Sequence, residues 1–420
     1  MAPMATWSHD ADGFVQPRTL GYYQARARGG VGLIICQSAV VLPEARAPGR
    51  LAVWDDKFIP GLASVASAIH AGGGKGAIQI THHGTILTQH KKSVKGPPEI
   101  DVVGASPAPW VFNNESPREA SQQDIDNLVN GLSEAARRVR DAGFDAVEIG
   151  GAHGYLVAQF LSPRTNRRND AYGGTPERRA RFACEVVSAI KAKAGRNFPV
   201  IIRMSADEFI AGGITIEEAK IHAALVAEAG ADALHVSAGC VDTAHLTNPC
   251  YLYPDALFAD LAWAIKQVVK APVMAVGKIL EPSLAESILE AGKADFIALG
   301  RALLADPDLP RKAEQGKPED INRCIYCNNC WDLQWRDSFK QRGLSCTVNP
   351  SVLREPDFDP RPAAAPKRVL VLGGGIAGIE AARVLAQRGH HVSLYEKNDS
   401  LGGQWQVAAR LPMKQAYGEM

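Results

Sequence analysis

The sequence predicts an α/β fold: a (β/α)8 TIM barrel, then a cysteine-rich segment, then the start of a Rossmann-like nucleotide-binding unit. Three observations support this prediction. Short β-branched runs alternate with helical stretches through the first three quarters of the chain, four cysteines gather between Cys324 and Cys346, and a strand with a glycine-rich turn follows Pro366. Continuous apolar strands that alternate with helices are typical of a parallel sheet buried on both faces.

The composition excludes several classes of protein. The chain has 420 residues, with 46 Lys and Arg against 45 Asp and Glu and a formal net charge of +1. This balance leaves no charge surplus for nucleic acid or for an anionic membrane surface. The sequence contains no apolar run of transmembrane length and no export signal at its N-terminus. We therefore expect no nucleic-acid or membrane partner, and a cytoplasmic location in which thiols stay free to bind metal.

Seven apolar runs are predicted barrel strands. They are residues 32–41, 76–81, 146–150, 199–204, 233–237, 272–277 and 296–300. Helical patterns lie between them, at residues 59–71, 121–142, 176–194, 216–229, 253–269 and 283–291. A glycine follows several of these helices, where we expect a left-handed residue to end the helix. These glycines are Gly72, Gly143, Gly195, Gly230 and Gly292.

An eighth strand is needed to close a (β/α)8 barrel. We predict that Met1-Ala-Pro-Met4 is the tail of this strand, so that the chain as given begins inside its first barrel strand. A half-built strand would expose the hydrogen-bonding groups of its neighbours. We therefore expect the chain to be a fragment at this end.

Polar residues gather at the predicted carboxyl ends of the strands, where barrels place their chemistry. They are Gln79, His82, His153, Tyr155 and Arg203. Gly277 and the pair Gly300-Arg301 follow the last two strands. Glycine-bearing turns let backbone N–H groups approach an anion, so we predict a phosphate site there.

The four cysteines Cys324, Cys327, Cys330 and Cys346 have the spacing C-x2-C-x2-C-x15-C. Soft thiolates select zinc and iron–sulfur clusters. Zinc sites of four cysteines usually pair two C-x2-C knuckles, whereas a 3+1 arrangement suits a 4Fe-4S cluster. Four reduced structural cysteines are a further interpretation. Disulfides are disfavoured, because cysteines this close cannot all pair without strain.

A nucleotide-binding pattern follows the linker at residues 363–366. A strand leads into Gly373-x-Gly375-x-x-Gly378, a helix follows, and a second strand at residues 391–395 ends at Glu396. A glycine triplet in this context is typical of a dinucleotide site, with the pyrophosphate at the helix N-terminus and the acid on the ribose. The chain stops at Met420, so this end also looks truncated.

These residues resemble the old yellow enzyme family, and within it the iron–sulfur flavoprotein branch that includes 2,4-dienoyl-CoA reductase, 2-enoate reductase and trimethylamine dehydrogenase. The resemblance runs over essentially the whole chain. Its carriers are residues 1–4, 77–84, 147–156, 161–174, 203–205 and 298–307, together with the cysteine loop. It implies an FMN-binding barrel at residues 1–318, a cluster segment at 319–362 and a partial FAD/NAD(P)-binding domain at 363–420.

The resemblance implies FMN in the barrel mouth. By this resemblance Pro3, Met4 and Ala5 lie beside the flavin ring, Gln79 binds its pyrimidine edge and Arg203 lies near flavin N1. A fixed guanidinium there favours the anion that forms on reduction. Gly277, Gly300 and Arg301 correspond to the phosphate site. Alternatively, Arg203 forms an ion pair inside the barrel. Gln79 has a similar alternative, as a strand residue whose polar groups are already hydrogen-bonded.

The resemblance also assigns a catalytic pair. Tyr155 matches the proton donor of the dienoyl-CoA reductases, and a phenol is protonated at neutral pH. His153 matches a polar position of the branch, while Gly150 stands where a histidine is often found. A packing tyrosine at the rim is the alternative for Tyr155. His245 and His235 are weak candidates for a second histidine, and His235 reads as structural.

In the last unit the resemblance implies FAD, held by Gly373, Gly375, Gly378 and Glu396, with Gly403 and Gln404 in the next turn. The cysteines would hold the 4Fe-4S cluster. NAD(P)H gives electrons in pairs, a cluster passes them singly, and flavins do both. We therefore expect a relay from NAD(P)H through FAD and the cluster to FMN, and reduction of an activated C=C bond.

Two alternatives stay open: oxidation of an amine at FMN with electrons leaving through the cluster, and a non-catalytic scaffold with a zinc site. We expect a small-molecule substrate, and the oligomeric state is left open, a homo-oligomer included. The loop from Thr85 to Trp110 is expected to cover the site. Its lysines, Lys91 and Lys92, would meet an acidic or CoA-bearing substrate or would simply be solvated.

Overall fold

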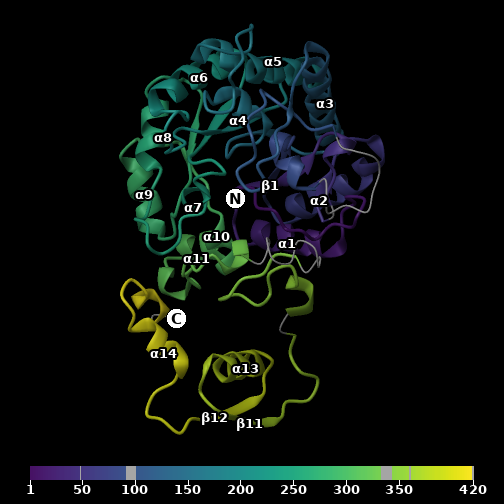
Figure 1. The fold of residues 1–420 in the computed structure, drawn as a ribbon. Coiled ribbons are helices and arrows are strands. Elements are labelled where there is room, and N and C mark those ends of the chain that lie inside the picture. The colour runs from purple at the N-terminus through teal and green to yellow at the C-terminus, as the bar shows by residue number, and fades with distance from the viewer. Residues whose placement is uncertain (48, 91–100, 333–342, 359–360, 419–420) are drawn as a thin grey trace.

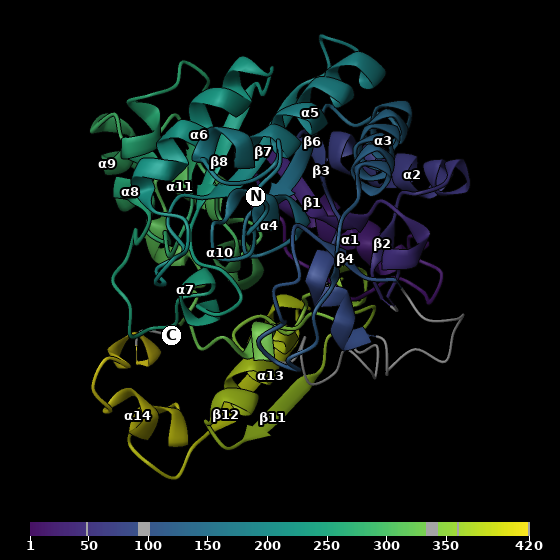
Figure 2. The same cartoon turned by 45° about the horizontal axis from the view of Figure 1, so that its top comes forward.

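The structure is a computed structural model that describes residues 1–47, 49–90, 101–332, 343–358 and 361–418. In this part of the chain the main sheet has the strand order β10-β9-β8-β7-β6-β3-β1-β2, and each neighbouring pair is parallel. Figures 1 and 2 show the helices as an outer layer around these strands. The predicted (β/α)8 barrel is therefore confirmed.

The eight strands of this sheet include one, β2, that was not predicted, and the other seven fall close to their predicted positions. They are β1 (Leu33–Val40), β2 (Leu51–Ala52), β3 (Lys75–Thr81), β6 (Ala146–Gly151), β7 (Val200–Ser205), β8 (Ala233–Ser237), β9 (Val273–Ala275) and β10 (Phe296–Ile297). The larger helices are α1 (Pro17–Arg28), α2 (Ile59–Ala71), α3 (Gln122–Asp141), α5 (Pro176–Ala194), α6 (Ile216–Glu228), α8 (Ala259–Lys266) and α9 (Pro282–Glu290). Shorter ones are α4 (Leu156–Leu161), α7 (Ala244–Thr247), α10 (Arg301–Ala305) and α11 (Leu309–Glu314).

The first residues close the barrel. The Ala2 N–H donates to the Leu299 carbonyl (2.8 Å), beside β10, and the Ile35 N–H of β1 donates to the Met1 carbonyl (3.1 Å). The N-terminal segment therefore bridges the first and last strands of the barrel, as the sequence predicts for residues 1–4. Inside the barrel, one residue from each of six strands forms an apolar layer: Ile35, Ala77, Ala146, Ile201, Ala233 and Met274.

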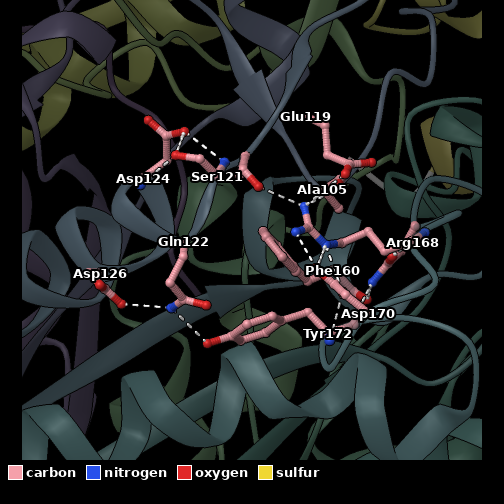
Figure 3. Close-up of polar contacts among 12 residues, drawn as sticks. Ala105, Glu119, Ser121, Gln122, Asp124, Asp126, Phe160, Arg168, Asp170 and Tyr172 are labelled. Carbon is pink, nitrogen blue, oxygen red and sulfur yellow. Dashed lines mark hydrogen bonds and ion pairs between the residues drawn. The ribbon is translucent and has the colours of Figure 1, made fainter.

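Local signals explain where the helices begin. Ser121 and Asp124 form a reciprocal capping box at the start of α3, and Thr175 and Thr215 accept a backbone N–H at the starts of α5 and α6. Such caps satisfy N–H groups that have no partner within the helix. The capping box is visible in Figure 3.

Two local predictions are wrong. Gly72 has φ −87° rather than a left-handed conformation, and the next residue, Gly73, takes that role with φ +92°. The helix predicted over 253–269 is confined to α8, because Ala256 has φ +54° and interrupts the helical path. The Leu257 N–H instead donates to the carbonyl of Gly277 (3.1 Å), so this stretch supports the turn after β9.

Arg168, in the motif at residues 161–174, holds two long connections of the barrel together. Arg168 donates to the carbonyls of Ala105 (3.0 Å) and Ala120 (2.8 Å) and pairs with Asp170 (2.6 Å). Figure 3 shows this guanidinium between the two segments, with Tyr172 directed toward Gln122. These contacts fix the long connection that follows β3 against the one that follows β6.

The cysteine-rich segment packs on the barrel. Arg26, fully buried on α1, pairs with Glu355 and also donates to the carbonyl of Leu303 (3.1 Å). The Leu344 N–H donates to the carbonyl of Thr6 (2.8 Å), just beyond the first barrel strand. These contacts place Cys346 next to the mouth of the barrel.

The last unit is a parallel pair, β11 (Arg368–Leu372) and β12 (His391–Tyr395), joined by α13 (Ile376–Gln387) and followed by α14 (Gln404–Ala409). It lies outside the barrel in both views (Figures 1 and 2). The predicted Rossmann-like start is confirmed. None of the described helices is long and apolar enough to cross a membrane.

Candidate active site in the barrel mouth

A buried polar network joins side chains from β3, β6 and β8. The Gln79 side-chain N–H donates to Glu148 Oε1 (2.8 Å), and His235 Nδ1 lies 2.7 Å from Glu148 Oε2. Glu148 and His235 are fully buried. Because the Gln79 amide nitrogen faces Glu148, its carbonyl oxygen is left to accept from a ligand N–H. The sequence analysis missed Glu148, although a carboxylate inside the apolar run 146–150 was a usable signal.

Arg203 lies on β7, between β6 and β8, and is the register partner of His235. Its Nη2 donates weakly to Ser237 Oγ (3.3 Å), and its Nε is buried with no hydrogen-bond partner among the described residues. Burial lowers the pKa of Arg203, and the nearby charge of Glu148 offsets this in part. A buried donor without a partner costs free energy, so this guanidinium fits a bound anion or a ring carbonyl.

His153 follows β6 in a left-handed conformation, with φ +62°. Its N–H donates to Ser205 Oγ (3.1 Å), and its Nε2 lies 2.7 Å from Ser237 Oγ. Burial lowers the pKa of His153 well below its usual range, and Arg203 adds to this effect. His153 is therefore neutral near pH 7 and acts here as a hydrogen-bonding group. Ser237, which it shares with Arg203, was also missed.

Tyr155 is half-buried at the start of α4, with its ring edge-to-face against His83 at 5.4 Å between centroids. Two guanidinium groups, those of Arg50 and Arg203, interact electrostatically with its hydroxyl. The sequence analysis did not single out Arg50. Nothing in its local pattern marks it, because it reaches Tyr155 only after β1 and β6 are placed in one barrel.

The two glycines of the predicted phosphate site lie at tight positions. Gly277 has φ +115°, and a Cβ there would lie 2.5 Å from the ring of Phe258. A Cβ on Gly300 would contact Met4 Sδ at 3.4 Å, which places this turn beside the predicted flavin-contacting segment of Pro3, Met4 and Ala5. Because glycine has no Cβ, a phosphate and a flavin ring could approach the backbone closely at these two turns.

The Arg301 side chain contacts residues outside the predicted phosphate site. It donates to the carbonyl of Pro249 (2.8 Å) and to the side chain of Asn328, and its guanidinium lies 4.8 Å from the ring centroid of Tyr326. Arg301 therefore faces the cysteine loop. Its assignment to the phosphate site stays a prediction.

All four predicted cysteines line one pocket, together with Arg301 and Leu304. Tyr326 (φ +48°) and Asn328 (φ +57°) curl the loop so that Cys324, Cys327 and Cys330 share it. Burial raises the pKa of Cys324 to about 12 and of Cys330 to about 11. Free thiols here would be protonated, and iron or zinc would have to stabilise the thiolates.

The four thiols line their pocket without converging on one point. Within the described residues, no three His, Cys, Asp or Glu side chains converge closely enough to hold one metal ion. A tetrahedral zinc site draws its four sulfurs to about 2.3 Å from one point, whereas a cubane holds each thiolate on a separate iron. Four thiols spread around one pocket suit the second arrangement.

The glycine-rich turn of the last unit is built as predicted. Gly373 has φ +100°, and a Cβ on Gly378 would lie 1.9 Å from the Gly373 carbonyl oxygen. Gly375 caps α13 and bridges to Gly402, beside Gly403 and Gln404. One Glu396 oxygen accepts the Gly374 N–H (2.7 Å), so this carboxylate braces the turn, and its ribose role stays a prediction.

Comparison with known proteins identifies the family. Residues 1–320 match the NADH:flavin oxidoreductase / NADH oxidase family. The chain belongs to this family. Residues 371–412 match an NAD(P)-binding Rossmann-like domain. The predicted membership of a flavin oxidoreductase family is thus confirmed, as is the start of an NAD(P)-binding domain.

The relatives of this chain are longer than the chain itself. It is 43% identical over 419 residues to an NADH oxidase of Thermoanaerobacter brockii (99% of this chain, 63% of that protein). It is 35% identical over 431 residues to a cinnamate reductase of Clostridium sporogenes (96% and 63%). A solved 2-naphthoyl-CoA reductase in complex with 2-naphthoyl-CoA superposes with a TM-score of 0.92 at 30% identity (100% and 65%). The chain therefore spans less than two thirds of the length of each of these relatives.

Not every predicted feature can be placed. Lys91 and Lys92, proposed to meet an acidic substrate, lie outside the described residues. His245 lies on α7, and its ring is 6.2 Å from that of Tyr253. It has no described contact with the network around Arg203. The prediction that His235 is structural agrees with its complete burial against Glu148.

Buried histidines give the family member a pH-dependent stability. Burial lowers the pKa of His9, His82 and His222 to about 4 in each case. Because the unfolded pKa is near 6.5, the unfolded chain binds more protons below pH 6.5. Stability is therefore full above pH 6.5 and falls as the pH drops toward 4.

We expect each of these histidines to reduce the free energy of unfolding by about 2 kcal/mol between pH 7.5 and pH 5. Urea unfolding at the two pH values measures the loss. His222→Gln should lose about 2 kcal/mol less than the wild type, whereas His391→Gln, at an exposed position on β12, should match it. If the wild type and His222→Gln lost equal amounts of unfolding free energy, the lowered pKa of His222 would be contradicted.

Proposed function

We propose that this chain reduces an activated C=C bond, with Tyr155 as the proton donor and NAD(P)H as the electron source. One observation carries the proposal. The Tyr155 hydroxyl lies at the barrel mouth under the influence of two guanidinium groups, Arg50 and Arg203, on the side of the site where Gln79 and Arg203 present ligand-binding groups. Cations beside a phenol stabilise the phenolate that forms when its proton is given up.

FMN fits the mouth of the barrel. The residues that would hold it are Pro3, Met4, Ala5, Gln79, Arg203, Gly277, Gly300 and Arg301. Bound there, FMN would supply the hydride. The orphaned Nε of Arg203 and the free carbonyl oxygen of Gln79 support this assignment. The overall change is balanced: the double bond gains a hydride and a proton, and NAD(P)H is oxidised to NAD(P)⁺.

The chain's own groups handle the proton. Tyr155 gives its proton to the α-carbon, and Arg50 and Arg203 stabilise the resulting phenolate until solvent restores the proton. Neutral His153 and Ser237 hold the Arg203 side of the site in place through their hydrogen bonds. A general acid of this kind contributes about 10²- to 10⁴-fold to the rate.

The remaining assignments follow the division into residues 1–318, 319–362 and 363–420. Cys324, Cys327, Cys330 and Cys346 would hold a 4Fe-4S cluster, which would pass single electrons. The glycine turn with Gly373 and Gly378 would hold the FAD pyrophosphate. We propose a cytoplasmic enzyme with a small-molecule substrate.

Oxidation of an amine is the second candidate, and the charges of the mouth disfavour it. A substrate ammonium about 4 Å from a guanidinium is repelled by about 4 kcal/mol at the effective dielectric of a protein surface. Arg50, which is not among the residues that would hold FMN, is such a cation beside Tyr155. A non-catalytic scaffold with a zinc site would not explain the polar side chains of the barrel mouth.

An anaerobic assay separates the candidates. The chain is loaded with FMN, reduced with dithionite and mixed with cinnamate, and the return of the oxidised flavin absorbance is followed. In parallel the oxidised form is mixed with dimethylglycine. Reoxidation by cinnamate with formation of the saturated acid supports the proposal. Bleaching by dimethylglycine alone would establish the second candidate, and failure to bind FMN would overturn both.

A further inference from the structure

Arg50 is held in the barrel mouth by an aromatic platform. It immediately precedes β2, and its guanidinium carbon lies 4.2 Å from the ring centroid of Trp7. Trp7 follows the predicted flavin-contacting segment of Pro3, Met4 and Ala5 and has φ +52°. Nη1 of Arg50 reaches Ser38 Oγ only at 3.4 Å. The side chain is therefore positioned by stacking on Trp7 and by its interaction with Tyr155, and its Nε has no hydrogen-bond partner among the described residues.

Among the described residues, the charge of Arg50 has no counter-charge. It forms no ion pair within the residues that the structure describes, and its Nε is buried without a hydrogen-bond partner. Burial lowers its pKa, and the group that acts electrostatically on it is Tyr155. The other charges at this site do not neutralise it. Arg203 is a second cation, His153 is neutral, and Glu148 is engaged by Gln79 and His235.

A half-buried guanidinium without a carboxylate is costly unless a ligand completes it. A planar fork of N–H donors matches the two oxygens of a carboxylate. The position beside Tyr155 adds a second constraint, because the anion must lie next to the atom that receives the proton. In an α,β-unsaturated acid the carboxylate is attached directly to the α-carbon, so one substrate satisfies both residues.

We propose that Arg50 binds the carboxylate of the substrate, and that the substrates of this site are α,β-unsaturated free acids rather than neutral esters or cationic amines. This inference rests on the proposed function. Negative charge grows on the carboxylate as hydride adds to the β-carbon, and Arg50 stabilises it there. Tyr155 then protonates the α-carbon beside the bound group.

The test compares cinnamate with methyl cinnamate, which has the same double bond without the charge. Their Kd values are measured by titration of the oxidised, FMN-loaded chain, from the change in flavin absorbance, and their kcat/KM values with the dithionite-reduced chain. The variants are Arg50→Met, Arg50→Gln and Arg50→Lys, with retained FMN as the check on folding. Binding does not require turnover, so the inference is tested even if reduction fails.

A lost charge-assisted hydrogen bond is worth about 1.5–3 kcal/mol, or about 10- to 150-fold. We expect Arg50→Met and Arg50→Gln to weaken cinnamate binding by this factor and to change methyl cinnamate by less than about 3-fold. Arg50→Lys should fall between them and the wild type. Equal losses for both compounds, or tighter wild-type binding of the ester, would overturn the inference. Charge-selective binding without any reduction would overturn only the proposed function.

Discussion

Replacing Tyr155 by phenylalanine is expected to slow the reoxidation of reduced flavin by cinnamate about 10²- to 10⁴-fold. The variant keeps the ring that packs against His83 and loses only the hydroxyl that faces Arg50 and Arg203. Its helix should be unaffected, because the Tyr155 side chain makes no capping hydrogen bond at α4. Stopped-flow absorbance under anaerobic conditions measures the rate.

Two controls separate a lost proton donor from general damage. Ferricyanide takes electrons from reduced flavin without needing a proton donor, so its reaction should keep the wild-type rate in Tyr155→Phe. Tyr172→Phe removes a hydroxyl that bonds Gln122 and Glu185 away from the mouth, and its cinnamate rate should stay within about 3-fold of wild type. A wild-type cinnamate rate in Tyr155→Phe would assign Tyr155 to packing at the rim.

Replacing Cys330 by serine is expected to remove the cluster. The wild-type chain, purified anaerobically, should contain about four iron and four acid-labile sulfide atoms, and Cys330→Ser should contain close to none. The serine hydroxyl is a harder and far less acidic ligand than a thiolate, so the fourth iron loses its support. FMN content should stay near one per chain, because Gln79 and Arg203 lie on barrel strands that Cys330 does not form.

Cys184 provides a matched control on α5, outside the pocket of the four cysteines. Cys184→Ser should keep the full complement of iron and sulfide. One zinc per chain with no sulfide, in the wild type, would instead favour the scaffold interpretation. Iron that survives in Cys330→Ser at the wild-type level would show that the four cysteines are not its ligands.

The candidate site divides into parts that local sequence reveals and parts that it does not. Gln79, His153, Tyr155 and Arg203 were predictable, because polar residues at the ends of apolar strands face a barrel mouth. Glu148 and Ser237 were missed, although both lie within predicted strands or at their ends. Their role depends on the neighbour across the sheet, which the chain order alone does not specify.

By itself, the sequence determined the alternation of strands and helices, most helix boundaries, the glycine turns and the cysteine spacing. Each depends on short-range periodicity or on backbone conformations that few residues adopt. Only the tertiary structure decided that Glu148 joins Gln79 and His235, and that Arg50 stacks on Trp7 beside Tyr155. These contacts join distant segments, so they exist only once the barrel has closed, and the chemistry of the site depends on them.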